Sequence, residues 1–157
     1  MKSKGLRIAI VVGRFNEEIS MRLLEGTRSR LEDLGVATTD ITVFWVPGAF
    51  EIPFACQEII HKVSVDAVIT LGAVVQGGTP HFDFVAGECI RGIQKVSLST
   101  NTPIALGVLT TDTYEQALER SDTSYVDHDG TAGDKGSSAA EAAVAMAELS
   151  QSLNTRG

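Results

Sequence analysis

The chain has 157 residues, of which 43% are hydrophobic and 21% charged, and this suits one domain, residues 1–157, with a single core. Its formal net charge of −7 argues against a general nucleic-acid binder, which needs a basic face, but allows an anionic substrate at a local site. No apolar run is long enough to span a bilayer, and residues 6–12 are too short for a signal peptide, so we expect a cytoplasmic protein with no membrane partner.

Short apolar runs alternate with amphipathic stretches along the chain, which predicts repeated strand–helix units. Strands are expected at residues 6–12, 41–46, 65–71 and 104–109. Helices are expected from Asn16, as N-cap, to about Leu34, at 50–62, from His81 to about Leu98, after a capping box at 112–115, and from Lys135 to about Leu153. The pattern predicts an α/β fold with a four-stranded parallel sheet between helices and right-handed crossovers.

One segment stands out, LGAVVQGGTPHF at residues 71–82. Thr79 stands where a helix N-cap is expected, and Pro80 where proline is favoured in the first turn. The two preceding glycines leave backbone N–H groups beside the positive end of that helix, which is a place that binds phosphate. His81 would then lie next to the anion as a proton carrier.

The spacing by itself leaves a plainer interpretation open. A strand-to-helix turn needs glycine for steric reasons, and a first-turn histidine such as His81 is often a solvated or capping residue. The segment is not a P-loop, because no Gly-Lys-Ser/Thr follows, and it is not a Rossmann fingerprint, because G-x-G-x-x-G is absent.

The segments that follow the four strands should gather at the carboxyl edge of the sheet, where such folds bind ligands. Phe15 and Phe50 offer flat apolar surfaces there, and Glu51 offers a hydrogen-bond acceptor. That mixture suits a planar polar heterocycle with a phosphorylated partner. Phe15 as a hydrophobic staple and Glu51 as a helix-dipole partner are the alternatives.

Two further features suggest no chemistry. Cys56 and Cys89 are the two cysteines, and we expect reduced, buried thiols because no Cys/His spacing suggests zinc. Residues 121–134 read as an acidic loop, in which His128 is expected to be a solvated histidine and not a metal ligand.

Several motifs resemble the 6,7-dimethyl-8-ribityllumazine synthase family over nearly the whole chain. They are GRFN (13–16), LLEGTR (23–28), WVPGAFEIP (45–53), LGAVVQGGTPHFDFVAGE (71–88), GVLTTDTYEQALER (107–120) and AGDKG (132–136). The resemblance implies a three-layer, flavodoxin-like fold and a transferase of riboflavin biosynthesis. Such an enzyme condenses 5-amino-6-(D-ribitylamino)uracil with 3,4-dihydroxy-2-butanone 4-phosphate, releases phosphate and water, and uses no metal or redox cofactor.

The resemblance also implies roles for individual residues. Phe15 would stack on the pyrimidinedione. The ring edge and the ribityl chain would meet Ala49, Phe50, Glu51, Ala73, Val74 and Val75.

The phosphorylated substrate has its own implied residues. Gly78 and Thr79 would hold the phosphate and His81 would move protons. Arg120 would reach the phosphate from an adjacent subunit, because a guanidinium suits phosphate, with Lys135 near the same pocket.

Three positions depart from the family pattern. Gln76 stands where a basic residue is usual, Leu106 where many members have an aromatic residue, and the loop after Arg120 is several residues longer than usual. The site would therefore lack one local positive charge, and the ring pocket would be less enclosed. The longer loop affects how Arg120 is placed relative to Lys135.

Two other functions compete with this one. Archaeal riboflavin synthase resembles the family and dismutates two lumazines, but its reaction needs no phosphate site. A non-catalytic flavin-binding or shell-forming protein would not need His81, Thr79 and Arg120. A response-regulator domain is excluded because no acidic pocket follows the first strand at Gly13.

The resemblance implies a homopentamer with active sites between subunits, closed by heterologous contacts. Larger shells need ring-to-ring contacts near residues 121–134. That segment contains four aspartates and no Lys or Arg, so like charges oppose packing there and an isolated pentamer is expected; the four are Asp122, Asp127, Asp129 and Asp134.

Overall fold

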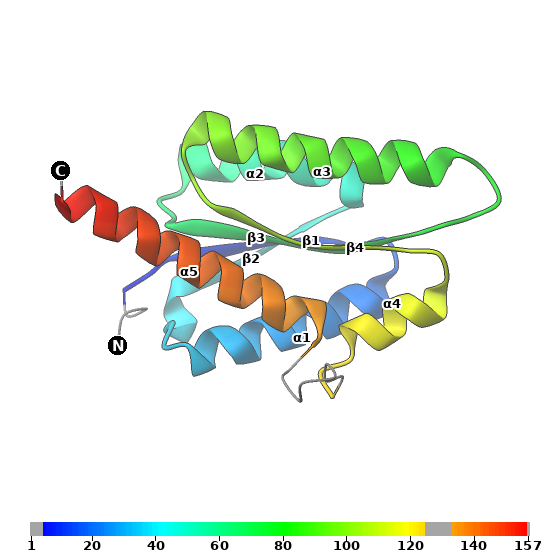
Figure 1. Ribbon diagram of the computed structural model, residues 1–157, viewed down its shortest axis with the longest axis horizontal. Helices are drawn as coiled ribbons and strands as arrows, with labels where there is room; N and C mark the ends of the chain where they lie inside the picture. The colour runs from blue at the N-terminus through cyan, green and yellow to red at the C-terminus, as the bar shows by residue number, and fades with distance from the viewer. Residues whose placement is uncertain (1–4, 125–132, 157) are drawn as a thin grey trace.

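The protein is a three-layer α/β sandwich in the computed structural model, which describes residues 5–124 and 133–156 (Figure 1). Helices α2 and α3 cover one face of a parallel sheet, and α1, α4 and α5 cover the other. The predicted fold class is therefore confirmed. The sheet has the order β2-β1-β3-β4 and consists of β1 (Ile8–Gly13), β2 (Ile41–Val46), β3 (Ala67–Val75) and β4 (Ile104–Thr111).

The helices are joined to the strands by short turns, two of which are 3-10 helices, η1 (Thr38–Asp40) and η2 (Ala49–Glu51). Within the described residues, no helix combines the length and apolarity needed to cross a bilayer. The helices are α1 (Glu17–Asp33), α2 (Ile52–Lys62), α3 (His81–Thr100), α4 (Tyr114–Ser121) and α5 (Lys135–Arg156).

The central strands are buried on both faces, which explains why their sequences are apolar at every position. In β1, Ile8, Ile10 and Val12 pack in the core beneath α1 and α5. The alternate residues Ala9 and Val11 pack in a second core beneath α2 and α3. The sheet thus separates two apolar clusters.

Several of the boundaries differ from expectation. Strands β3 and β4 extend past residues 71 and 109, because they continue to pair as far as Val75 and Thr111. The capping box of α4 lies one residue later than predicted. The hydroxyl of Thr113 accepts from the Gln116 amide at 3.1 Å, and Oε1 of Gln116 accepts from the Thr113 amide at 3.2 Å.

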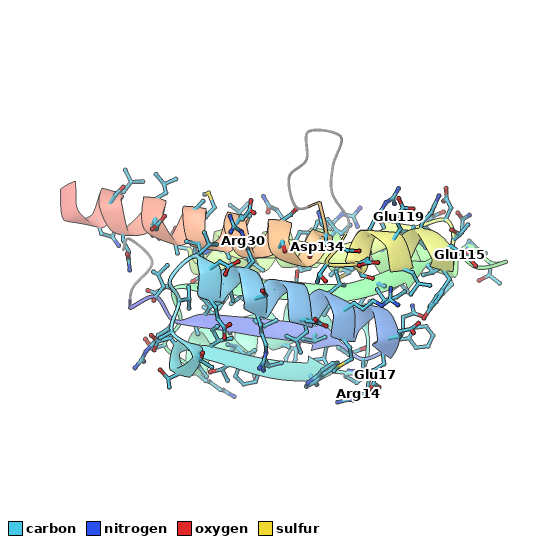
Figure 2. The ribbon with its side chains drawn as sticks, turned by 90° about the horizontal axis from the view of Figure 1, so that it is seen from below. Arg14, Glu17, Arg30, Glu115, Glu119 and Asp134 are labelled. Carbon is cyan, nitrogen blue, oxygen red and sulfur yellow. The ribbon has the colours of Figure 1, made fainter. Side chains whose placement is uncertain are left out.

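Close contact between α1 and α5 fixes the last helix. The hydroxyl of Thr27 donates to the carbonyl of Gly136 at 3.1 Å. Asp134 is 1% exposed and accepts from the Ser137 amide at 2.9 Å, as an N-cap of α5. A Cβ on Gly26 would lie 2.5 Å from Asp134 Oδ2, so only glycine leaves room for this carboxylate. Figure 2 places Asp134 where α1 and α5 meet.

The prediction of an exposed acidic loop at residues 121–134 is wrong at both of its ends. Asp134 belongs to the interior and not to an exposed loop, and Ser121 is the last residue of α4. Asp122 accepts hydrogen bonds from Ser124, which hold its pKa below the usual range. The predictions for Asp127, His128 and Asp129 lie outside the described residues.

Cys56 and Cys89 are both free and buried, as predicted. Burial raises the pKa of Cys56 to about 12 and that of Cys89 to about 11. The native thiols should therefore resist alkylation at pH 8 and both should react after denaturation. The raised pKa values also make the stability of the fold depend on pH. The protonated, buried thiols contribute fully to stability below about pH 9, and this contribution is lost as pH rises towards 11–12 and the thiols ionise. Equal thiol reactivity with and without denaturant would contradict the buried placement.

The two glycines within α3 should respond oppositely to alanine. A Cβ on Gly92 would lie 2.8 Å from Cγ of Pro53, whereas a Cβ on Gly87 would meet nothing within 4 Å. Gly92→Ala should lower the free energy of unfolding by about 1–3 kcal/mol through overpacking. Gly87→Ala should raise it by about 0.5–1 kcal/mol through helix propensity. Denaturant titrations at one fixed protomer concentration measure both, and changes of the same sign would contradict this packing.

Candidate functional site

A cavity of about 700 Å³ opens at the carboxyl edge of the sheet. It lies where β1 and β3 are neighbours while their following helices, α1 and α3, pass to opposite faces, the position at which such folds bind ligands (Figure 1). Most of the residues predicted for the site line this one cavity: Phe15, Ala49, Phe50, Glu51, Ala73, Val74, Val75, Thr79 and His81.

Two exposed aromatic rings form an apolar surface in this cavity. Phe15, which follows the buried strand β1, is 74% exposed, and Phe50, which follows the edge strand β2, is 63% exposed. The Phe15 amide donates to the carbonyl of Pro47 at 3.0 Å, which joins its turn to the turn that carries Phe50. Phe15 is therefore not buried as a hydrophobic staple, and both rings are available to a planar ligand.

Asn16 occupies the predicted N-cap position of α1, where its carbonyl accepts from the amides of Ile19 and Ser20 at 3.1 Å, but its side chain does not cap the helix. Asn16 precedes α1 with φ 63°, in the left-handed region, and makes no side-chain cap hydrogen bond. Its side-chain Nδ2 instead donates to the carbonyl of Ala73 at 3.1 Å. The amide faces β3 because the left-handed conformation turns the side chain away from the start of the helix.

The glycine segment after β3 is open to a ligand. The Gln76 amide donates to Thr111 at 2.9 Å and continues the pairing of β3 with β4. Beyond it, the amides of Gly77, Gly78 and Thr79 donate to no other described residue, and a Cβ on either glycine would meet nothing within 4 Å. Gly77 and Thr79 line the cavity, and Gly78 lies between them in the chain.

The start of α3 is displaced from its predicted position. The helix begins at His81, so Pro80 is the flanking residue and not the first helical one. The Thr79 hydroxyl accepts from the His81 amide at 3.4 Å. His81 is exposed, and its imidazole forms no hydrogen bond with another described residue. The amides and the imidazole together therefore face solvent at the positive end of α3.

The charges around the cavity do not favour an anion. Its lining includes the carboxylates of Glu51 and Glu88, and no Lys or Arg among the residues described. Arg91 pairs with Glu88 at 2.7 Å from one turn further along α3. Among the described residues, no group of three or more His, Cys, Asp or Glu is arranged to hold a metal ion. A phosphorylated ligand would therefore need a cation from outside this cavity.

Three of the predicted residues lie elsewhere on the protomer. Leu106 of β4 lines a separate apolar groove between α3 and α5, with Leu98, Met146 and Leu149. Arg120 is exposed in the last turn of α4, and Lys135 begins α5.

The helix that carries Arg120 is fixed to α1. The hydroxyl of Tyr114, at the start of α4, donates to Glu18 at 2.8 Å, and the guanidinium of Arg22 donates to the carbonyl of Leu118 at 3.5 Å. Helix α4 lies on the opposite face of the sheet from α3 (Figure 1). The structure thus divides the predicted residues into two sets on one protomer.

Sequence reasoning missed several residues of the lining. Phe84, Val85 and Glu88 follow His81 at spacings of three, four and seven, which places them on one face of α3. That spacing was the available signal. The rest of the lining comes from Phe82 and from segments that were expected at this edge of the sheet, through Asn16, Pro47, Gly48 and Gly77.

Comparison with known protein families agrees with the resemblance that the sequence motifs indicated. A family model described as 6,7-dimethyl-8-ribityllumazine synthase matches residues 5–151, which span both the cavity and the α1–α5 contact. The chain belongs to the 6,7-dimethyl-8-ribityllumazine synthase family, which makes it a transferase of riboflavin biosynthesis.

Proposed function

We propose that the protein condenses 5-amino-6-(D-ribitylamino)uracil with 3,4-dihydroxy-2-butanone 4-phosphate to form 6,7-dimethyl-8-ribityllumazine, with release of phosphate and water. One observation supports this most strongly. A single cavity combines two exposed aromatic rings with a glycine segment whose amides have no described partner, and His81 lines the same cavity. A heterocyclic substrate and a phosphorylated substrate would thus be held side by side.

The aromatic half of the cavity suits the pyrimidinedione. Phe15 would stack on the ring, and the turn that follows β2 would meet the ring edge and the ribityl chain through Ala49, Phe50 and the Glu51 carboxylate. Glu51 accepts no side-chain hydrogen bond from another described residue, so it is available to hydroxyl donors. Backbone groups at the end of β3 would complete the ring contacts, from Ala73, Val74 and Val75.

The glycine half suits the phosphate. The amides of Gly78 and Thr79 would donate to its oxygens at the positive end of α3. An amine then attacks a ketone and water leaves. After phosphate is eliminated, the second amine attacks the remaining carbonyl, and the ring closes with loss of a second water. Holding two substrates in register supplies much of the acceleration. Proton transfer by His81 adds about 10²–10⁴-fold. None of these steps is assigned to a metal or a redox cofactor.

A second copy of the chain would complete the site. The cavity of one protomer contains no cation among its described residues, and Leu106, Arg120 and Lys135 lie away from it. In a ring of heterologous contacts each protomer can present these three residues to its neighbour, with Arg120 on the phosphate. We propose a cytoplasmic, isolated homopentamer. Asp134 no longer counts against larger shells, because it is buried.

Replacement of His81 should separate catalysis from binding. Supplied with both substrates, the purified protein should form the lumazine, detected by its absorbance, and release one phosphate per turnover. His81→Ala should lower kcat by roughly ten- to a thousandfold and leave a residual rate from substrate positioning. His61→Ala, at the exposed end of α2, is the matched control and should be neutral.

Two outcomes would contradict this proposal. Lumazine dismutation without phosphate release would indicate a riboflavin synthase, and lumazine binding without turnover would indicate a non-catalytic flavin-binding protein. An unchanged rate for a folded His81→Ala variant would make His81 a structural residue.

Mixed assemblies test whether neighbouring copies share a site. Arg120→Ala should weaken the phosphorylated substrate by roughly ten- to a hundredfold, through loss of a charge-assisted contact. Phe15→Ala should weaken the pyrimidinedione instead. If the two variants are unfolded and reassembled together, about a quarter of the sites should carry neither defect, because each interface draws one copy at random from each side.

The control for this mixture is Arg28→Ala, an exposed arginine on α1 that has no assigned role. Mixed with Phe15→Ala, it should restore about half of the sites, because only one side of each interface can then be defective. If the Phe15→Ala and Arg120→Ala mixture recovers no activity while the control mixture does, both residues serve the same subunit and the shared site is wrong.

A further inference from the structure

The turn between β1 and α1, residues 13–16, is held firmly against β2. The amides of Arg14 and Phe15 donate to the carbonyls of Val46 and Pro47, at 2.8 and 3.0 Å. The Arg14 guanidinium also lies over the Trp45 ring, 4.7 Å from its centre. All these contacts fix the turn to the β2 side of the cavity.

Two side chains of α1 support the turn from the helix side. The buried hydroxyl of Ser20 donates to the carbonyl of Gly13 at 2.6 Å. Glu17 lies 3.6 Å from the guanidinium of Arg14, and Figure 2 shows the two side by side at the start of α1. The exposed ion pair is weak by itself, but it adds to the stacking of Arg14 on Trp45.

The connection across the cavity to β3 is different. Among the described residues, the Asn16 side chain provides the one side-chain hydrogen bond from this turn to β3, by donation from Nδ2 to the Ala73 carbonyl at 3.1 Å. Asn16 is also one of two non-glycine residues with positive φ in the described chain, the other being Asn101. Asparagine tolerates this conformation better than most residues and, unlike glycine, carries a donor that can reach β3.

We propose that Asn16 is a positioning residue of the pyrimidinedione half of the site. Its amide fixes the ring of Phe15 relative to the backbone groups at the end of β3, so the width of the slot between them depends on one hydrogen bond. The amide acts through Phe15 and Ala73 and makes no contact of its own with the substrate. This inference rests on the proposed function, because it takes the lumazine as the ligand of that slot.

Binding of the fluorescent product, 6,7-dimethyl-8-ribityllumazine, measures this role. Asn16→Gly keeps the backbone conformation and removes the amide, and it should weaken lumazine binding by about tenfold. Affinity for inorganic phosphate, measured by competition with the phosphorylated substrate, should stay within about twofold, since the glycine segment is separate. Asn101→Gly is the matched control for asparagine at positive φ and should leave lumazine affinity unchanged.

A double-mutant cycle separates positioning from direct contact. In a Phe15→Ala background there is no ring to position, so Asn16→Gly should change lumazine affinity by less than about twofold. If Asn16 instead touched the ligand, the loss would remain about tenfold in that background. Additive effects, or an Asn16→Gly variant that binds like the wild type, would overturn the inference.

The ligand-free protein supplies a test that does not depend on the proposed function. Asn16→Asp places a carboxylate opposite the Ala73 carbonyl, and only its protonated form can donate to that oxygen. Folding therefore raises the pKa of the introduced carboxyl group, and the loss of stability relative to wild type should be present at neutral pH and should shrink as pH falls towards about 4. A loss that does not vary with pH would contradict the hydrogen bond. Failure of the wild type to bind lumazine would contradict only the proposed function.

Discussion

The position of the site is set by the point in the sheet at which the connections from two neighbouring strands pass to opposite faces. Because β1 and β3 are neighbours, and α1 and α3 leave them on opposite faces, the backbone parts at their carboxyl ends and no helix covers the gap among the described residues. Phe15, the η2 turn and the glycine segment each follow one of the three strands that meet there. Their convergence is a consequence of strand order, and the two central strands, β1 and β3, provide the buried base of the site.

The second constraint is electrostatic. A chain with net charge −7 and a cavity lined by Glu51 and Glu88 is a poor host for a phosphate ester by itself. Amides at the start of α3 provide partial positive charge, but no full charge comes from the described lining. Arg120 is the kind of group that the cavity lacks. It is exposed on α4, the helix that the hydrogen bond between Tyr114 and Glu18 joins to α1. In the proposed arrangement, assembly and catalysis are linked, because the missing charge would come from another copy.

The sequence predicted those features that depend on local chemistry. Continuous apolar runs predicted a doubly covered parallel sheet, and the glycine segment predicted an open turn before α3. Each follows from periodicity or from a backbone that only certain residues adopt. The shared carboxyl edge followed from the parallel direction of the strands, whereas their order in the sheet was not predicted.

Features that depend on contacts distant in sequence were not predicted. Asn16 was correctly predicted at the N-cap position, but the hydrogen bond from its side chain to Ala73 across the sheet has no signal in the local sequence. Asp134 looked like a loop charge, but the space left by Gly26 in α1 admits it to the interior. The capping box of α4 lies one residue later than predicted, because the Thr113 hydroxyl accepts from the Gln116 amide and Gln116 Oε1 accepts from the amides of both Asp112 and Thr113.

The central claim is that a cation from a second copy completes the phosphate half of the cavity. An experimental structure of the assembled protein with inorganic phosphate bound tests it most directly. We expect a closed ring of five subunits. Phosphate should bind the amides of Gly78 and Thr79 and lie within hydrogen-bond reach of Arg120 from the neighbouring subunit. A phosphate held only by groups of its own subunit, or an assembly in which Arg120 faces solvent, would contradict it.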